Sequence, residues 1–241
     1  WDYFGLKAQF EEYTLNPNTK NIAEVRPKVE EWIGSRKGER PFFLFWHIYD
    51  VHAPYVKARE EFYADEYGGP FADGETRWDW ESQSKTAFRK RGETVASAKL
   101  TQEDVEYLKA SYDSGIKTVD EELERFFSSL KERGALENTL VIISSEHGED
   151  LKEHGFIFHR DLYDVNIRVP LAFIYPALKP QWVAESVSLL DIMPTILGTL
   201  GVSAPEHGEG KDLRPLLAGK DEARSIFTER APFDEYAVRT S

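Results

Sequence analysis

Five of the six histidines in this sequence gather in three short segments, which also carry several carboxylate side chains. These segments are residues 47–55, 145–149 and 153–160. Imidazole and carboxylate groups together suit the binding of a divalent metal ion and the transfer of protons near neutral pH. The residue types therefore predict one polar site that binds a metal and performs acid–base catalysis.

Continuous apolar runs lie next to these segments. Residues 42–46 precede the first segment, residues 140–144 precede the second, and residues 169–175 follow the third. An unbroken apolar run is typical of a strand that is buried on both faces, as in a parallel sheet covered by helices. Ligands of such sheets bind beyond the carboxyl ends of the strands. We therefore expect one mostly parallel sheet with the histidine-bearing segments at its carboxyl edge.

The strongest helix signal spans residues 101–133. Its apolar residues recur at steps of three and four, which places them on one stripe that packs against the sheet. Thr101 and Asp104 resemble a capping box, and Gly134 suits the end of the helix. A second helix is predicted at residues 22–33.

The remaining chain adds shorter elements. Residues 191–200 predict a further helix, and residues 226–228 predict a short strand. Residues 57–100 show no clean apolar period, which predicts a long loop that is either functional or disordered. Strands that alternate with helices indicate an α/β fold.

The composition narrows the possible functions. The formal net charge of -13 repels a phosphate backbone, so we expect no nucleic-acid partner. The same charge repels anionic substrates at long range, so an anion site requires a local cationic pocket or a bound metal. The chain has no cysteine, which excludes disulfides and a cysteine nucleophile within it. No apolar run approaches the ~20 residues that a membrane-spanning helix needs, so we expect no membrane segment.

Several stretches resemble segments of the sulfatase family, in the order in which that family has them. They are PFFLFWHIYDVHAPY (residues 41–55), NTLVIISSEHGEDLKEHG (138–155), LYDVNIRVPLAFIYP (162–176) and LLDIMPTILGTLGV (189–202). Two more, GKDLRPLLAG (210–219) and FTERAPFDEYAVRT (227–240), resemble the entry to the family's smaller C-terminal subdomain. The resemblance implies an alkaline-phosphatase-like α/β fold, a mostly parallel sheet with helices on both faces. Residues 1–222 would be part of the catalytic domain, and residues 223–241 the start of the subdomain.

This resemblance also implies an activity, the hydrolysis of a small-molecule or carbohydrate sulfate ester with a divalent cation, usually Ca²⁺, with Mg²⁺ or Mn²⁺ as alternatives. The family's nucleophile is a formylglycine made from a Cys or Ser in a Cys/Ser-x-Pro-x-Arg motif. These 241 residues contain no such motif. We therefore expect the nucleophile and two metal-binding aspartates to lie upstream or on a second chain, and this chain alone to be inactive. The resemblance suits an extracytoplasmic location.

The resemblance assigns roles residue by residue. Glu146 and His147 match the pair that binds the metal, with Glu146 where the family usually has Asp. His52 matches the catalytic histidine that protonates the leaving alcohol. His159 matches a cationic catalytic group that holds a sulfate oxygen, and His154 is assigned to substrate binding. We expect His52, Glu146, His147 and His159 to converge.

Alternatives remain open for the residues and for the protein. Glu146 and His147, followed by Glu149 and Asp150, also suit the start of a helix. His47 is interpreted as a core histidine rather than a functional one. At the level of the protein, the chain is also compatible with a related phosphomonoester, phosphodiester or phosphonate hydrolase. A non-catalytic remnant of a sulfatase is the third hypothesis.

Overall fold

The computed structural model describes most of the chain. The described residues are 8, 10–13, 21–36, 41–72, 77–78, 87–90, 93–96, 100–155, 157–159, 161–220, 224–230 and 235–240. They fall into two compact units, residues 1–135 and residues 136–241. No helix in this described part is both long and apolar enough to cross a membrane.

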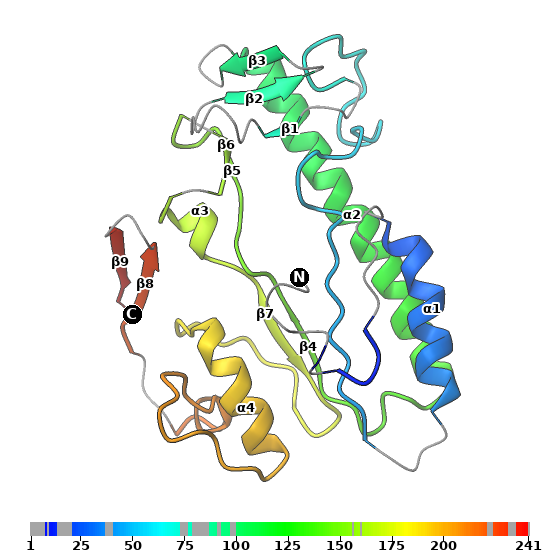
Figure 1. Cartoon of the computed structure of the whole chain (residues 1–241), viewed down its shortest axis with the longest axis vertical. Coiled ribbons are helices and arrows are strands. Elements are labelled where there is room, and N and C mark those ends of the chain that lie inside the picture. Colours follow the sequence, from blue (N-terminus) through cyan, green and yellow to red (C-terminus); the bar gives the residue numbers. More distant parts are fainter. Residues whose placement is uncertain are drawn as a thin grey trace. The chain divides into compact units, whose positions relative to one another are not determined.

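Two helices organise the first unit. They are α1 (Ile22–Ser35) and α2 (Gln102–Glu132), which lie side by side in Figure 1. At the start of α2, the Thr101 side chain accepts from the Asp104 backbone N–H, while the Asp104 carboxylate accepts from the Thr101 N–H at 2.8 Å. Gly134 follows the helix with a φ of 69°, a left-handed conformation that glycine adopts readily. Both predicted helices and the capping box are confirmed.

Residues 42–46 do not form the buried strand that their apolar run predicted. They pair with no strand of the described structure, and Phe43 and Phe45 are 63% and 68% exposed. An apolar run reports only a preference for burial, whereas a strand also needs a partner backbone. Trp46 packs edge-to-face on Phe126 of α2 instead. His47 is exposed, so its interpretation as a core histidine is wrong as well.

Residues 57–100 contain more regular structure than expected. The backbone forms β1 (Arg77–Trp78), β2 (Ala87–Lys90) and β3 (Glu93–Ala96), which pair as an antiparallel sheet in that order. Residues 77–96 contain no unbroken apolar run and no clean alternation, so their pattern did not indicate these strands. The prediction of one long loop is therefore wrong for this part of the segment.

The second unit contains β4 (Val141–Ser144) and β7 (Leu171–Ile174), close to the positions predicted for them. Their direction differs from the prediction, because the two strands pair antiparallel. Between them lie the hairpin of β5 (Asp150–Leu151) and β6 (Ile157–Phe158) and the helix α3 (Asp164–Ile167), which return the chain beside the strand it left (Figure 1). Apolar runs predict burial and not strand direction, so a parallel pair is wrong here.

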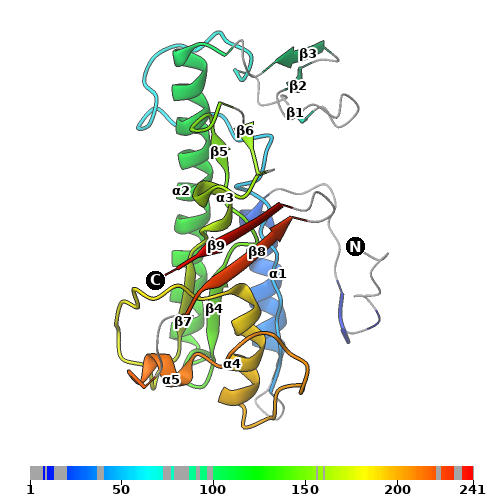
Figure 2. The same ribbon diagram turned by 90° about the vertical axis from the view of Figure 1, so that its left-hand side faces the viewer.

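The rest of the second unit follows β7. A short 3₁₀ turn, η4 (Leu189–Asp191), leads into α4 (Ile192–Thr199), and α5 (Arg214–Leu217) follows. The chain ends in the antiparallel hairpin of β8 (Ile226–Arg230) and β9 (Glu235–Arg239), visible in Figure 2. The predicted helix and terminal strand are confirmed, while the domain boundary after residue 222 stays a prediction.

Candidate functional site

The segment after β4, residues 145–155, is held beside α3 by two main-chain hydrogen bonds. The N–H of Gly148 donates to the carbonyl of Asn166 at 2.7 Å, and the N–H of Glu149 donates to the carbonyl of Val165 at 3.0 Å. A Cβ atom on Gly148 would lie 2.0 Å from the Val165 carbonyl oxygen. Only glycine permits this approach, so the sequence Glu146-His147-Gly148-Glu149 is tied to one backbone position.

The hairpin β5–β6 brings Glu149 and His159 together. Asp150 pairs with Phe158 in this hairpin, so the residues that flank the pair face each other across it. The His159 Nδ1 atom lies 2.9 Å from Glu149 Oε1, and the Glu149 side chain is only 4% exposed. The rings of His159 and His147 stack, with centroids 3.8 Å apart. Two of the predicted site histidines are therefore in contact.

A second carboxylate–imidazole pair lies beside the first. Asp150 is fully buried, and its Oδ2 atom lies 2.6 Å from Nδ1 of His154. Its Oδ1 atom accepts from the N–H groups of Lys152 and His154. The His154 ring stacks on Tyr163 at a centroid distance of 3.7 Å and an angle of 4°. His154 is thus held along one edge by a carboxylate and across one face by an aromatic ring.

The backbone of this hairpin is strained. Lys152 and Phe158 are the two non-glycine residues of the described chain with positive φ, at 86° and 85°. Each such residue costs about 1–3 kcal/mol and persists only where the surroundings hold it, often at functional sites. The strain lies directly between the two carboxylates and the two histidines that they hold, which supports a functional assignment of this hairpin.

Glu146 and His147 present atoms that fit a cation. Nδ1 of His147 lies 2.8 Å from the carbonyl oxygen of Gly148, and since a carbonyl only accepts, Nδ1 carries the proton and Nε2 is the nitrogen able to bind a metal. That Nε2 atom lies 3.8 Å from Glu146 Oε1. Two ligand atoms each ~2.3 Å from one ion lie at most ~4.6 Å apart, so the pair can share a divalent cation.

The helix-start interpretation of these residues is wrong. No helix begins at residues 145–149 in the described chain, and Asp150 enters strand β5 instead. Glu149 and Asp150 hold histidines instead of starting a helix, a role that their sequence context did not indicate. The i,i+4 spacing of Asp150 and His154 was the available signal, but in a helical reading it means only a surface pair.

His52 belongs to the first unit. Its Nδ1 atom lies 2.7 Å from the carbonyl oxygen of Ala53, and its ring stacks on Tyr49 with centroids 4.3 Å apart. The neighbouring Asp50 is buried and accepts from the Ile22 N–H at 2.9 Å, which ties this segment to the start of α1. Its convergence with the histidines of the second unit stays a prediction.

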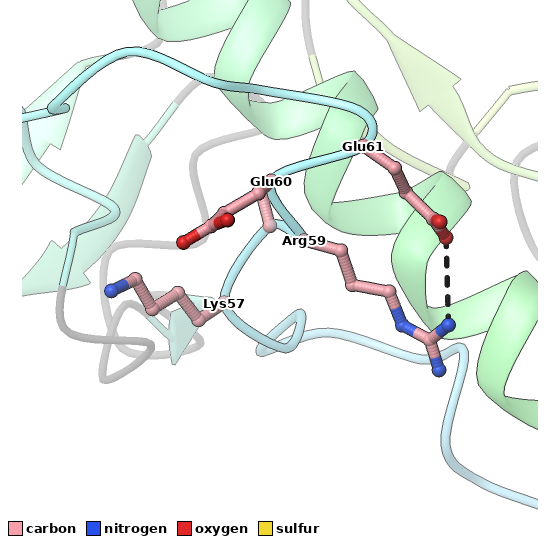
Figure 3. A pocket seen from close by; sticks show the side chains of 5 residues that line it. Lys57, Arg59, Glu60 and Glu61 are labelled. Carbon is pink, nitrogen blue, oxygen red and sulfur yellow. Dashed lines mark hydrogen bonds and ion pairs between the residues drawn. The ribbon is translucent and has the colours of Figure 1, made fainter.

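The segment after His52 is anchored on α2 by Arg59. Its guanidinium bonds both carboxylate oxygens of Glu121 at 3.0 Å and Thr118 Oγ1 at 2.9 Å. The hydrogen bond from Arg59 lowers the pKa of Glu121, and the pKa of Arg59 is raised in turn. Residues 57–61 line an open hollow of about 650 Å³, and Figure 3 shows the Arg59 guanidinium beside Glu61. This arginine is engaged by acids, which argues against it as a sulfate ligand.

Comparison with known proteins supplies independent information. Residues 2–202 match the profile of the family called Sulfatase. An arylsulfatase of Clostridium perfringens is 28% identical over 193 residues, which are 78% of this chain and 40% of that protein. An N-acetylglucosamine-6-O-sulfatase of Bacteroides thetaiotaomicron is 28% identical over 162 residues, or 66% of this chain and 29% of that protein. The chain therefore spans less than half the length of these relatives.

A solved structure supports the fold. The phosphonate monoester hydrolase of Agrobacterium radiobacter superposes with a TM-score of 0.67 at 21% identity, over 92% of this chain and 48% of that one. At this identity the likeness concerns the fold alone. Together with the family match, it places the chain in the alkaline-phosphatase-like α/β fold expected from the sequence.

Proposed function

This chain belongs to the sulfatase family, and we propose that it carries the metal-binding and proton-transfer part of an enzyme that hydrolyses sulfate esters. The observation that carries this proposal is the pairing of Glu149 with His159, whose ring stacks on His147, one of the two proposed metal ligands. Buried carboxylates that fix imidazole rings are the usual means of setting a catalytic histidine in one tautomer and orientation.

Each histidine has a proposed role. Glu149 accepts from Nδ1 of His159, so we assign Nε2 of that ring to a sulfate oxygen of the substrate. His154, oriented in the same way by Asp150, is assigned to substrate binding. His52 is proposed to protonate the leaving alcohol, because imidazole titrates near neutral pH in general. This last role rests on the sequence motif around His52.

Glu146 and His147 are proposed to hold a divalent cation, with Ca²⁺ preferred and Mg²⁺ or Mn²⁺ as alternatives. A carboxylate suits all three ions, while an imidazole ligand is more usual for transition metals. When bound, such a cation would polarise a sulfate oxygen and stabilise negative charge in the transition state. Glu146 has one methylene more than the usual aspartate, so its oxygen reaches farther from the backbone of the segment that α3 fixes.

The nucleophile is proposed to come from residues outside this sequence. Within the 241 residues there is no cysteine and no Ser-x-Pro-x-Arg motif from which a formylglycine could be made. Covalent sulfate transfer requires an activated nucleophile, which acid–base groups alone do not replace. An upstream segment or a second chain would supply it.

The substrate class follows from chemistry and from the relatives. A sulfate ester of a sugar or small molecule is proposed, and the N-acetylglucosamine-6-O-sulfatase of Bacteroides thetaiotaomicron supports the carbohydrate class by its name. A chain of net charge -13 would accept such an anion only where a metal and protonated histidines offset the charge. Residues 57–100 are proposed to contribute to specificity.

Turnover by an extended protein tests this function. The chain is fused behind the nucleophile segment of a sulfatase and produced with formylglycine formation, then assayed with an aryl sulfate and an aryl phosphonate ester. The sulfate is expected to react faster, and His159→Ala is expected to lower kcat by about 10²–10⁴-fold. A higher kcat/KM for the phosphonate would favour the related phosphonate hydrolase instead. Hydrolysis of neither ester by a correctly oxidised, folded protein would favour the non-catalytic remnant.

A further inference from the structure

Two arginines of the C-terminal hairpin form ion pairs with the segment from Asp161 to Asp164, which leads into α3. Nη1 of Arg239 lies 2.8 and 2.7 Å from the two carboxylate oxygens of Asp164. Nη1 of Arg230 lies 3.4 Å from Asp161 Oδ1, with both side chains only 15% exposed, and 2.5 Å from Glu235 Oε2 on the same hairpin. Both acids belong to the same short stretch of chain, which lies beside the hairpin in Figure 1.

The register of the hairpin explains how both arginines reach this loop. Arg230 is opposite Glu235 and Ile226 is opposite Arg239, so the two arginines stand at opposite ends of the hairpin. These two pairs are separated by an even number of residues, which places Arg230 and Arg239 on the same face of the two strands. One face of the hairpin therefore contacts the segment from Asp161 to Asp164 at two points, through Arg230 and through Arg239.

Tyr163 lies between Asp161 and Asp164 in the sequence. Its carbonyl accepts from the N–H groups of Asn166 and Ile167, at 2.8 and 3.1 Å, which fixes its backbone at the start of α3. Its ring covers one face of His154 at 3.7 Å. Whatever fixes the loop from Asp161 to Asp164 therefore also fixes the ring against which His154 packs.

The hairpin has one exposed face and one half-buried face. None of its described side chains is among the buried hydrophobic residues, and the large side chains on its outer face are exposed: Phe227, Tyr236 and Val238. Arg239 makes one more contact, from Nε to Ser186 Oγ at 3.2 Å. The ion pairs of Arg230 and Arg239 with Asp161 and Asp164 thus connect the half-buried face of the hairpin with the start of α3.

We propose that Arg230 and Arg239 are positioning residues for the active site, acting through Asp161, Asp164 and Tyr163 on His154. Asp150 orients the edge of the His154 ring, and the hairpin, through Tyr163, orients its face. The hairpin thereby becomes part of the substrate-binding apparatus although it lies outside the histidine motifs. This inference rests on the proposed function only in giving His154 a substrate to bind.

The test uses the ¹⁵N and ring-proton NMR signals of His154 in the 241-residue chain, assigned with His154→Gln. Stacking on Tyr163 shifts the ring protons upfield, and Tyr163→Leu gives the unstacked reference. Arg230→Gln and Arg239→Gln are each expected to lower the ratio of stacked to unstacked His154 by about two- to fivefold, the range available to an ion pair of this kind. The double variant is expected to lower it further.

The control and the rescue separate positioning from stability. Arg214→Gln removes an arginine that is paired with Asp212 at 2.6 Å in the same unit, and it is expected to leave the His154 signals unchanged. The charge swap Arg239→Asp with Asp164→Arg is expected to restore them. Unchanged His154 signals in both single variants would overturn the proposal, including where thermal stability falls.

The outcome for His154 itself is a separate matter. In the extended enzyme, His154→Asn with an unchanged KM would remove its substrate-binding role, while the coupling seen by NMR would stand. A raised KM in Arg239→Gln, with kcat unchanged and the charge swap restoring it, is the result expected if both proposals hold. If His154→Asn raises the KM but the His154 NMR signals do not respond to Arg230→Gln or Arg239→Gln, only the role of the hairpin is refuted.

Discussion

Carboxylates occur in two regions of this molecule with different partners. On α2, Glu122 accepts from Nε of Arg26 at 2.7 Å, and Glu121 accepts from Arg59. The pKa of each glutamate is lowered, in both cases chiefly by the hydrogen bond from its arginine. Arginine keeps its charge at every working pH, so these pairs fix the helices and the loop and exchange no proton.

In the segment after β4 the partners are histidines. Glu149 faces His159 and the fully buried Asp150 faces His154, at 2.9 and 2.6 Å. A histidine is able to gain or lose a proton near neutral pH, and its orientation decides which nitrogen meets a substrate. The residue type alone therefore does not distinguish a structural acid from a functional one, whereas the residue that it pairs with does.

Gly148→Ala is expected to have the largest effect. A Cβ would meet the Val165 carbonyl at 2.0 Å, so the segment must leave α3 and displace the residues that it carries. We expect a loss of about 1–3 kcal/mol in the free energy of unfolding. In the extended enzyme we expect a loss of activity of about 10²-fold or more. Gly208→Ala, whose Cβ would meet its nearest atom at 3.4 Å, is the control in the same unit. Wild-type turnover in Gly148→Ala would contradict the claim that the close approach of Gly148 to α3 fixes the position of this segment.

Glu149→Gln tests the functional side of the comparison. The amide keeps the size of the side chain but offers a weaker acceptor, which frees the orientation of His159. We expect kcat/KM of the extended enzyme to fall about 10–100-fold, as is usual for groups that orient catalytic or metal-binding side chains. Circular dichroism and the melting temperature should stay close to those of the wild type. A large loss of stability with full activity would place Glu149 with the structural acids.

Glu122→Gln tests the structural side. The folded-state pKa of Glu122 lies below the ordinary value, so its contribution to stability is complete above about pH 4.5. That contribution is lost as the pH falls through the lower, folded pKa. Urea unfolding at pH 7 should show a loss of about 1–3 kcal/mol, which shrinks at acid pH.

The control on the same helix is Glu124→Gln, since Glu124 is exposed. Its effect on unfolding should be small at both pH values. A destabilisation by Glu122→Gln that is equally large at low pH would show that packing, rather than the ion pairs with Arg26 and Arg125, explains the loss.

Asp212→Asn is expected to have the smallest effect. The pKa of Asp212 is lowered mainly by the hydrogen bond from Arg214, which is half exposed. Ion pairs of this exposure contribute little, so the melting temperature should not change measurably. A clear drop in the melting temperature would mean that exposed carboxylate–arginine pairs contribute more to the stability of this unit than we expect.

The sequence predicted much of this fold and less of the site's internal contacts. The capping box of Thr101 and Asp104 is local chemistry and was predictable within three residues. The antiparallel pairing of β4 with β7 depends on how the chain between them folds back, which no apolar run records. The same holds for residues 42–46, whose covering partner is not encoded in their own pattern.

Within the site, His147 and His159 were predicted from the motif, and their ring contact follows from the hairpin β5–β6. Tyr163 and the arginines of the last hairpin were not predicted. They are separated from His154 by up to 85 residues of sequence, so only the tertiary structure brings them into one chain of contacts. His52 remains a prediction from its motif.

The most direct test of the central claim is the turnover of an aryl sulfate by the purified 241-residue chain in the presence of calcium. We propose that this chain orients histidines and binds a cation, and that the nucleophile comes from another segment. We therefore expect no measurable hydrolysis by the chain alone, and hydrolysis once the formylglycine segment is joined to it. Turnover of roughly 1 s⁻¹ or above by the chain alone, the level of a complete enzyme, would contradict this division of roles.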